Sequence, residues 1–592
     1  MFSSLLLPPA LLLQLSGVIG SAPVQTAPPA PPVQQAQQPA AAKQPPASIT
    51  GQIISISGEP VNKAEVSARR VDVRDANLNP TNNVTTSDRS GVFTLSGLEP
   101  GRYVLSARKA GFVEQQYGAA RGSRMGTMLS LGPGQELRAI TLKLTPHAVI
   151  SGKVTDEDGE PVMFTHAQAL QQRFIRGKRQ WVPAGGGQVN DLGEYRIPNL
   201  QAGRYIIAVA AQSMRMPSGQ SRSGSAPEES YITTYYPGVH DPSEAATVEV
   251  AAGAEMRNVD LRLKKARTYR ISGKVSDAGK PGQNAMVMLM PAAQEGVGLM
   301  GMGRNASPVR NPEGAFEIGA VVPGTYMLVA QRMGGPGERS IARQEITVGN
   351  SNVENVVLTM TNGFEVAGTL RIEGKTKVST ENLRVFLEPQ ASMFFPGGSG
   401  PGSVKADGTF RLENITAEKY RVNVFPQTDF YVKTVRLGNQ EMRDGVVDFT
   451  NGAAGPIEVV LSTDGAAVEG AVHDSKGRPT GGVIVALIPD APNRDKYHLY
   501  RQSATDNTGA FSFRNVPPGS YKVFAWEQIE DAGWTDPALL ARYENEGKSL
   551  ALREAGQERV TMRFIAPEGG SRLEQEAEER EKSMELKPQA GR

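Results

Sequence analysis

The chain has 592 residues, 39% of them hydrophobic and 21% charged, which is typical of a folded protein too long for one ordinary domain. Its 63 lysines and arginines nearly balance its 61 acidic residues, so no global field favours nucleic acid or an anionic membrane. Cysteine is absent, which excludes disulfides, thiolate zinc sites and iron–sulfur clusters.

The N-terminal segment indicates export. Apolar runs at Leu5–Leu7 and Leu11–Leu15 precede the small residues Gly20–Ala22, although no lysine or arginine comes before them. Residues 1–22 therefore resemble a secretory signal peptide, and we expect a secreted or periplasmic protein of the cell envelope. Residues 23–48 are mostly Pro, Ala and Gln and predict a semi-rigid linker. No later segment reaches the ~18 apolar residues of a membrane span, so no integral membrane span is expected.

A phrase close to Ile-Ser-Gly-x-Val opens five successive stretches of the chain. Its glycines are 101, 121, 95 and 102 residues apart, about the length of one small β-sandwich. They are Gly51, Gly152, Gly273, Gly368 and Gly470.

A second landmark lies late in each stretch, where a glycine is followed two positions later by an aromatic residue. Ten residues after that glycine, a further turn leads into a tyrosine, and only the fourth stretch replaces the turn glycine, with Glu418. The constant offset indicates five copies of one structural unit. The first glycines are Gly91, Gly193, Gly314, Gly408 and Gly509, and the tyrosines are Tyr103, Tyr205, Tyr326, Tyr420 and Tyr521.

The residues around these landmarks predict strands joined by tight turns. Asp407-Gly408 and Pro518-Gly519 are turn signals, and alternation such as Phe410-x-Leu412 has the period of a half-buried strand. Turn, strand, turn and strand within about twenty residues predict an antiparallel hairpin. An alternating strand, for example Ile140-x-Leu142-x-Leu144, then closes each unit.

The predicted fold class is all-β, a tandem array of five antiparallel Greek-key β-sandwich domains. One short helix is expected in the last unit, within 536–555, because Pro537 suits a first turn and Leu539, Leu540 and Tyr543 share one face. The charged tail is expected to be disordered. The predicted boundaries are 49–146, 147–265, 266–362, 363–463 and 464–566 for the five sandwiches and 567–592 for the tail.

The phrase at residues 150–162, Ile-Ser-Gly-Lys-Val-Thr-Asp-Glu-Asp-Gly-Glu-Pro-Val, resembles the carboxypeptidase regulatory-like domain, as do the Gly-x-Tyr turn and tyrosine strand that follow it. The resemblance covers residues 49–565. It implies a transthyretin-like, or prealbumin-like, β-sandwich related to carbohydrate-binding-like sandwiches and to adhesin repeats. Because this sandwich hosts unrelated roles, the resemblance implies the fold more than the function. Tandem copies behind an export signal also resemble large bacterial envelope proteins.

Motifs with known chemistry are incomplete in this sequence. None of the five histidines begins a zinc-peptidase motif, and Gly296–Gly301 matches a dinucleotide fingerprint with no helix pattern after it, so we interpret it as a loop. Asp156–Gly159 lacks the other ligands of a calcium loop and predicts a turn. We therefore expect no catalytic, cofactor-binding or metal-binding residues and no cofactor.

Lysines in opening strands and asparagines near closing strands raise a further possibility. Adhesin-type relatives can join such a pair by an isopeptide bond beside a buried acid, but no such acid can be assigned here. The residues concerned are Lys153, Lys274, Asn258 and Asn355.

Two stretches combine aromatic and basic residues, a predicted loop at Arg173–Trp181 and the segment 494–501. Exposed rings can stack on sugar faces, which makes these stretches candidates for ligand binding. The competing and favoured interpretation packs the two tryptophans of the fifth unit against the predicted helix, since aromatic residues are more often buried. The candidate residues are Phe174, Trp181, Tyr497, Tyr500, Trp526 and Trp534.

The sequence thus predicts a non-catalytic structural or interaction protein of the bacterial cell envelope. Five sandwiches in a row predict an extended rod in which each unit contacts mainly its neighbours. The alternative function is polysaccharide binding through the aromatic loops of the second or fifth unit. Polysaccharide or other envelope proteins are the expected partners, nucleic acid is not, and the sequence leaves the oligomeric state open.

Overall fold

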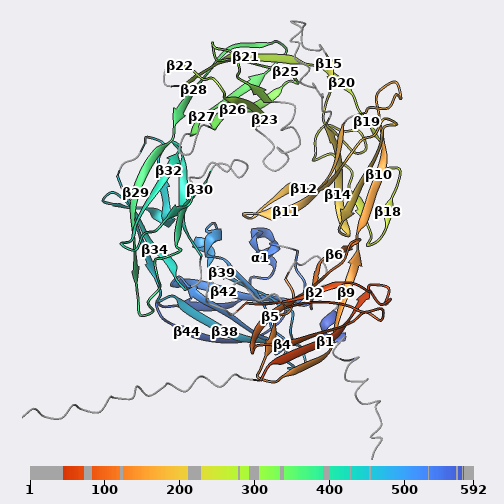
Figure 1. Ribbon diagram of the computed structural model, residues 1–592, viewed down its shortest axis with the longest axis vertical. Helices are drawn as coiled ribbons and strands as arrows, with labels where there is room; N and C mark the ends of the chain where they lie inside the picture. The colour runs from red at the N-terminus through yellow and green to blue at the C-terminus, as the bar shows by residue number, and fades with distance from the viewer. Residues whose placement is uncertain are drawn as a thin grey trace, which may run out of the picture. The chain divides into compact units, whose positions relative to one another are not determined.

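Nearly all regular structure among the described residues is β-strand (Figure 1). Contacts between residues join Pro45–Arg592 into one compact region. The predicted signal peptide and most of the predicted linker lie outside the described residues. Among the described residues, no helix has the length and apolar character needed to span a membrane. The computed structural model describes residues 45–578 apart from 72–82, 120–124, 164, 211–228, 278–279, 292–305, 334–338, 391–399, 427–428, 453–454, 531, 568–570 and 576–577.

The first repeat unit contains two sheets around one buried cluster. Its first strand begins at Ala47, inside the segment expected to be linker. One sheet has the order β4 (Val92–Leu98), β1 (Ala47–Ser55), β9 (Glu136–Pro146) and β6 (Phe112–Val113). The other has the order β3 (Asn83–Thr86), β2 (Glu65–Arg70), β5 (Gly101–Arg108) and β7 (Gln115–Gln116), with β8 (Leu129–Leu131) also on β5.

The second unit repeats this plan with a longer outer hairpin. One sheet has the order β13 (Glu194–Leu200), β10 (Ala148–Thr155) and β18 (Glu255–Met256), with β19 (Leu261–Arg262) also on β10. The other has the order β12 (Lys178–Gln188), β11 (His166–Ile175), β14 (Gly203–Ala210) and β16 (Thr234–Tyr235), with β17 (Val248–Val250) also on β14. A separate pair is β15 (Glu229–Tyr231) and β20 (Lys265–Arg267).

In the third unit the pairing of β27 with β28 joins the strands into one sheet. Its order is β22 (Lys280–Pro281), β21 (Tyr269–Asp277), β28 (Val353–Asn362), β27 (Arg339–Val348), β26 (Gly324–Met333), β23 (Met286–Pro291) and β24 (Ala306–Pro308), with β25 (Ala315–Val321) on β21.

The fourth unit again has two sheets. One has the order β32 (Thr409–Ile415), β29 (Phe364–Glu373), β37 (Ile457–Ser462), β34 (Tyr431–Leu437) and β35 (Gln440–Glu441). The other has the order β31 (Gly402–Ser403), β30 (Arg384–Pro389), β33 (Lys419–Phe425) and β36 (Val446–Asp448), and the 3-10 turn η2 (Arg443–Gly445) precedes β36.

The fifth unit adds short helical segments to its two sheets. The sheets have the orders β41 (Ala510–Val516), β38 (Ala466–His473) and β44 (Gln557–Arg563), and β40 (Arg501–Ala504), β39 (Ile484–Pro489), β42 (Gly519–Trp526) and β43 (Lys548–Leu552). The helical segments are η3 (Ala491–Asn493), η4 (Tyr497–Leu499), η5 (Gly533–Thr535) and α1 (Pro537–Arg542).

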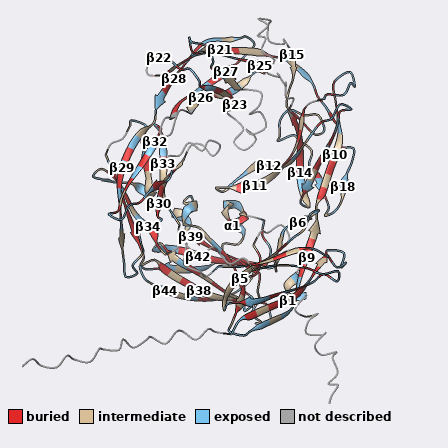
Figure 2. Ribbon diagram, viewed as in Figure 1, coloured by how far each residue is buried: buried red, intermediate tan, exposed pale blue. Residues whose placement is uncertain are grey.

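Side chains alternate between core and solvent along the strands, as the period-two sequence pattern predicts (Figure 2). In β1, for example, Ile49 and Ile53 are fully buried whereas Gln52 is exposed. Each unit has its own large cluster of buried apolar side chains. The all-β prediction is therefore confirmed.

The predicted hairpin between the two landmark turns is wrong in every unit. In the first unit β4 pairs with β1, whereas β5 pairs with β2 in the opposite sheet. The opening strand of each unit instead lies between two partners. It is antiparallel to the strand after the Gly-x-aromatic turn and parallel to the closing strand. The sheets therefore contain parallel as well as antiparallel pairs, whereas the sequence predicts purely antiparallel sheets.

A left-handed residue explains why the chain changes sheet. Six residues after the glycine of each Gly-x-aromatic turn, one residue has φ between 52° and 75°, and the pairing with the opening strand shifts register beside it. Such a bulge bends the strand end, so the next turn leads the chain into the other sheet. These residues are Gly97, Asn199, Ala320, Asn414 and Asn515.

The glycine of the opening phrase is required by a close approach of two strands. A Cβ atom at Gly51 would lie 2.1 Å from the carbonyl oxygen of Ile140, and one at Gly273 would lie 2.0 Å from that of Val356. Both oxygens belong to the closing strand, so only a residue without a side chain permits this parallel pairing.

The repeated tyrosine closes the turn that precedes its strand. The hydroxyl of Tyr103 donates to the carbonyl of Glu99 over 2.8 Å, and the hydroxyl of Tyr205 donates to that of Gln201 over 2.7 Å. Tyr326 and Tyr521 bond in the same way to the residue four positions before them. A buried hydroxyl thus satisfies a turn carbonyl in four of the units.

The helix predicted within 536–555 is much shorter than expected. Asp536 caps α1 by accepting from the amide of Ala538 over 2.9 Å, and the helix ends at Arg542. Lys548–Leu552 forms strand β43 on β42, because pairing with an available sheet edge outweighs weak helix propensity. Within the described part of the tail, the amide of Leu573 donates to the Glu527 carboxylate over 2.9 Å.

Candidate functional site

The two tryptophans of the fifth unit are core residues. Trp526 is 2% exposed and stacks on Phe524 with ring centroids 5.2 Å apart. Trp534 is 6% exposed and packs in the same cluster as Leu540 of α1. These tryptophans present no free ring face to a sugar, as the competing interpretation expected. The prediction that Trp526 and Trp534 bind a ligand through exposed rings is therefore wrong.

The aromatic stretch of the second unit is a hairpin, not the predicted loop, because β11 and β12 pair along its whole length. Phe174 is buried, and the guanidinium of Arg179 lies 4.8 Å from its ring centroid. Trp181 is half-buried against Leu170 and its neighbours. Of this stretch, Trp181 alone retains a partly exposed ring.

The tip of this hairpin contacts later units. Arg176 forms an ion pair with Glu388 of the fourth unit. Arg179 lies 3.6 Å from Glu530 of the fifth unit, and a Cβ atom at Gly177 would lie 2.1 Å from the hydroxyl of Tyr497. Contacts are therefore not confined to neighbouring units, which corrects the predicted rod with contacts mainly between neighbours.

Tyr497 and Tyr500 are the candidate residues that lie together. Their ring centroids are 5.5 Å apart with an interplanar angle of 35°, and both side chains are half-buried. The hydroxyl of Tyr500 donates to the carbonyl of Arg494 over 2.9 Å, and burial raises the pKa of Tyr500 to about 12. Both phenols are therefore protonated at neutral pH and offer ring faces and hydroxyl groups, not charge.

A cleft of ≈ 800 Å³ lies beside these tyrosines, between strands of the fourth unit and the 494–518 region of the fifth. We call it the basic cleft, because six cationic side chains and only two carboxylates line it. The cationic residues are Arg421, Lys433, Arg443, Lys496, Arg501 and Arg514, and the carboxylates are Glu441 and Asp444.

Polar contacts across the basic cleft join the fourth and fifth units. The Arg421 guanidinium lies 2.6 Å from Nδ1 of His498 and donates to the carbonyl of Asp444 over 3.0 Å. Lys496 pairs with the Asp444 carboxylate at 2.7 Å. Although part of the His498 ring faces solvent, partial loss of water and the nearby Arg421 charge lower its pKa to about 4.

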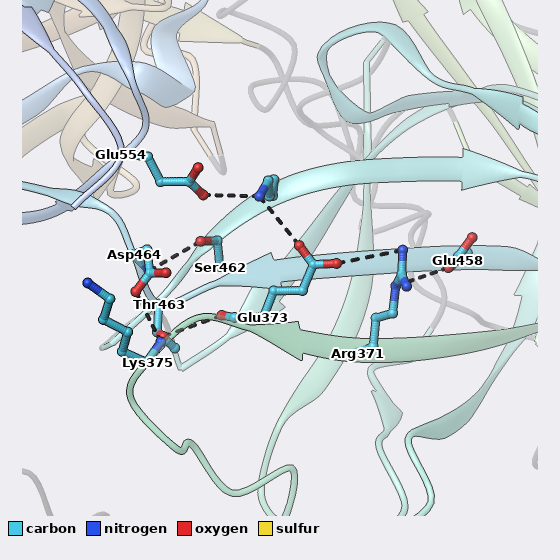
Figure 3. A network of polar contacts seen from close by, with 9 residues as sticks. Arg371, Glu373, Lys375, Glu458, Ser462, Thr463, Asp464 and Glu554 are labelled. Atoms are coloured by element: carbon cyan, nitrogen blue, oxygen red, sulfur yellow. Dashed lines mark hydrogen bonds and ion pairs between the residues drawn. The ribbon is translucent and has the colours of Figure 1, made fainter.

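A chain of ion pairs runs from Glu458 through Arg371 and Glu373 to Lys433 and Glu554 (Figure 3). Lys433 lies 3.4 Å from Glu373 and 3.0 Å from Glu554 of the fifth unit. Glu373 in turn lies 3.8 Å from Arg371, which reaches Glu458 at 3.2 Å. These contacts fix Lys433 on the exposed side of β34.

The acidic turn at Asp156–Gly159 uses its oxygens within the fold. One carboxylate oxygen of Asp156 accepts from the amides of Asp158 and Glu160, and the other accepts from the hydroxyl of Tyr231. Within the described part of the chain, no group of three or more His, Cys, Asp or Glu residues is placed to hold a metal ion. Asp156–Gly159 thus forms a turn, as the sequence predicts.

The lysine–asparagine pairs considered for isopeptide bonds lie on the surface. The Lys153 ammonium lies 3.3 Å from Glu194, and Asn258 is exposed at φ 60° in a bulge. Asn355 occupies the corresponding bulge of the third unit and is also exposed. An exposed pair lacks the dry, acid-lined environment that this cross-link requires.

The basic cleft was not predicted. Lys496 and Arg501 belong to the stretch that contains the two tyrosines, but Arg421 and Arg514 lie within strands β33 and β41, 93 positions apart in the sequence. Arg421 directly follows the repeated tyrosine, and Arg514 lies in the strand after the Gly-x-Phe turn. Nothing in one sequence indicates that these positions face each other.

Comparison with known proteins identifies the first unit. The family model of the carboxypeptidase regulatory-like domain matches residues 48–145. No curated protein sequence matches the chain.

Solved structures give only distant similarities. The Bacillus anthracis TIE protein is 10% identical with a TM-score of 0.15, over 70% of this chain and 73% of that chain. GBS52, the minor pilin of Streptococcus agalactiae, is 12% identical with a TM-score of 0.20, over 37% and 96%. The 3-chlorocatechol 1,2-dioxygenase of Rhodococcus opacus 1CP is 13% identical with a TM-score of 0.13, over 17% and 59%. Similarity this low supports no conclusion about function, whereas residues 48–145 match the model of the carboxypeptidase regulatory-like domain.

Proposed function

We propose that this chain is a non-catalytic structural or interaction protein of the bacterial cell envelope, built from five carboxypeptidase regulatory-like sandwiches with the predicted boundaries, except that the first sandwich begins at Ala47. The observation that carries the proposal is the role of the repeated residues. The opening glycine admits the closing strand, the second glycine forms a turn and the tyrosine closes another turn. Residues that recur for folding alone favour a scaffold, with function residing in the surfaces between and around the units.

Contacts between units support the same proposal. Arg343 of the third unit pairs with Glu418 of the fourth at 2.8 Å, at the position where the repeat otherwise has glycine. The departure from the repeat thus joins two units. Specific polar contacts at such joints are expected where relative orientation matters for binding a partner.

Cell fractionation tests the envelope location. The full chain is expressed in a bacterial host, and the N-terminus of the recovered protein is sequenced. We expect the protein in the periplasmic or extracellular fraction, with residues 1–22 removed. A matched variant that lacks residues 2–22 is expected to remain in the cytoplasm. Full-length protein in the cytoplasm would contradict the proposal.

Crosslinking in the same cells tests the structural or interaction role. A photoreactive amino acid at an exposed position, such as Val357, is expected to capture envelope proteins or polymers, whereas one at buried Leu358 is not. If exposed positions across all five units capture nothing, and the purified chain instead turns over a small substrate, the non-catalytic proposal fails.

Polysaccharide binding is a second candidate, favoured by the tilted pair Tyr497 and Tyr500. Two half-exposed rings side by side can stack on the apolar face of a sugar. A glycan array with the full chain and with Tyr497→Ala tests it, and Tyr117→Ala in the first unit is the control. Retention that depends on Tyr497 supports sugar binding, and no retention on any glycan rejects it.

A further inference from the structure

The basic cleft has an open sheet edge along one wall. Strand β34 pairs with β37 on its inner side, whereas on its outer side β35 covers Arg436 and Leu437 and the Met442 amide donates to the Val435 carbonyl over 2.8 Å. In the described part of the chain, no further strand lies beside Tyr431–Thr434, and these residues line the cleft. An open edge presents backbone amide and carbonyl groups that an added strand can pair with.

Charge in the cleft is only partly balanced. Arg421 donates to a carbonyl oxygen and contacts an imidazole, and Arg501 donates to the carbonyl oxygens of His498 and Tyr500 over 2.7 and 3.0 Å. Neither guanidinium forms an ion pair with a described carboxylate. Burial lowers the pKa of both groups. Partly buried cations with neutral partners favour an anionic ligand.

We propose that the basic cleft binds an extended acidic segment of another polypeptide, which adds a strand to the open edge of β34. The added backbone pairs with Tyr431–Thr434, and its acidic side chains lie towards Arg421, Arg501 and Arg514. The four residues of this edge span ~13 Å at ~3.3 Å per residue, so four or five residues of a partner fill it. This inference rests on the proposed interaction function and names the chemistry of the partner.

Two features favour a peptide over a saccharide as the occupant. A sheet edge offers donors and acceptors at the spacing of a polypeptide backbone, which a sugar chain does not reproduce. Tyr431 and Phe430 of the cleft wall are 8% and 4% exposed, so neither presents a free ring for stacking. The Tyr497–Tyr500 pair contributes neither ring to the cleft lining.

Fluorescence anisotropy with the full chain tests the proposal. The probe is a labelled octapeptide of alternating valine and aspartate, and we expect it to bind saturably. Binding is expected to weaken as the salt concentration rises from 50 to 500 mM, because the electrostatic screening length falls from about 14 to about 4 Å. The same peptide with every backbone nitrogen methylated lacks backbone donors, and its lysine version lacks acidic groups. Both are expected to bind at least about tenfold more weakly.

Substitutions locate the binding site. Arg514 and Arg443 are exposed, and the Arg443 side chain is 92% exposed, so Arg514→Glu and Arg443→Glu are expected to leave the fold intact. Together they are expected to weaken peptide binding about tenfold or more. Arg138→Glu makes the same charge change on the first unit, where the side chain is 78% exposed, and is expected to leave binding unchanged.

Each other outcome overturns the proposal. Binding that survives the substitutions places the peptide elsewhere, and equal binding of the N-methylated peptide excludes strand addition. Binding of a uronic-acid oligomer but not of the peptide makes the cleft a saccharide site. If no probe binds, the proposal that the cleft binds an acidic segment is rejected. The export and crosslinking experiments test the proposed function independently of this result.

Discussion

At the scale of single residues, the opening glycine of each unit makes a direct prediction. A Cβ atom at Gly273 would lie 2.0 Å from the Val356 carbonyl oxygen, a contact that the paired strands cannot relax without separating. Gly273→Ala is therefore expected to destabilise the chain by about 3 kcal/mol or more. Urea denaturation with Gly349→Ala as control measures this, because Gly349 has no atom within 4 Å of its added Cβ. Equal stability of the two variants would contradict the close-approach explanation.

His498 makes a prediction about pH. Its pKa in the folded chain is about 4, below the ordinary 6.5, so the unfolded state takes up a proton first as the pH falls. The stabilisation that the uncharged His498 gives the folded state is therefore complete above pH 6.5 and is lost as the pH falls from 6.5 to 4. Because part of the ring faces solvent, we expect a loss of no more than about 1 kcal/mol. Thermal denaturation measures this loss of stability between pH 6.5 and 4. The loss should be absent in His498→Gln and present in His240→Gln, a substitution at an exposed histidine.

At the scale of strands, the bulge after each Gly-x-aromatic turn is testable in the third unit. Ala320 has φ 59°, a left-handed conformation that costs an alanine about 1 kcal/mol and a glycine almost nothing. Ala320→Gly is therefore expected to stabilise the chain by about 1 kcal/mol. Ala315→Gly, in the same strand but absent from the left-handed residues, is expected to destabilise it by about 0.5–1 kcal/mol. Denaturant midpoints of both variants decide this, and a loss of stability in Ala320→Gly would contradict it.

The sequence predicts the strands better than it predicts their partners. Strand ends, turns and buried faces follow from glycine positions and period-two alternation, which act over a few residues. Pairing depends on the bulges at Asn199, Asn414 and Asn515, and an isolated asparagine between strands does not signal a change of sheet. The helix ended early for a similar reason, since the edge of β42 competes for Lys548–Leu552. The cleft residues were missed because their proximity depends on packing between units.

At the scale of the whole molecule, Glu418 connects two units. Its carboxylate is 9% exposed, accepts from Arg343 at 2.8 Å and also contacts Thr416 and Tyr420. Glu418→Gln removes the charge that Arg343 pairs with and is expected to cost about 1–3 kcal/mol. Amide exchange in β27 and β33 should quicken. Glu365→Gln removes the exposed pair with Arg411 and should change stability by less than about 0.5 kcal/mol. Equal effects of the two substitutions would argue against a structural joint at Glu418.

The first and fifth units also contact each other, although contacting residues such as Arg102 and Ser512 are 410 positions apart in the sequence. The amide of Ser130 donates to the Asn507 side chain over 3.0 Å, and the amide of Asn507 donates to the carbonyl of Met128 over 3.1 Å. The turn 506–509 thus serves its own unit and the first unit at once. Such a contact restricts both ends of the folded chain without any covalent link.

Asn507→Ala tests whether this contact persists in solution. The substitution removes the acceptor for the Ser130 amide, so that amide is expected to exchange with solvent about tenfold faster, which corresponds to ~1.4 kcal/mol. Asp191 occupies the same turn position in the second unit and is exposed, which makes Asp191→Ala the matched control. Hydrogen exchange followed by mass spectrometry should show faster exchange near Ser130 only in Asn507→Ala, with the buried residue Ile53 unchanged. Identical exchange at Ser130 in both variants would mean that the first and fifth units do not hold each other.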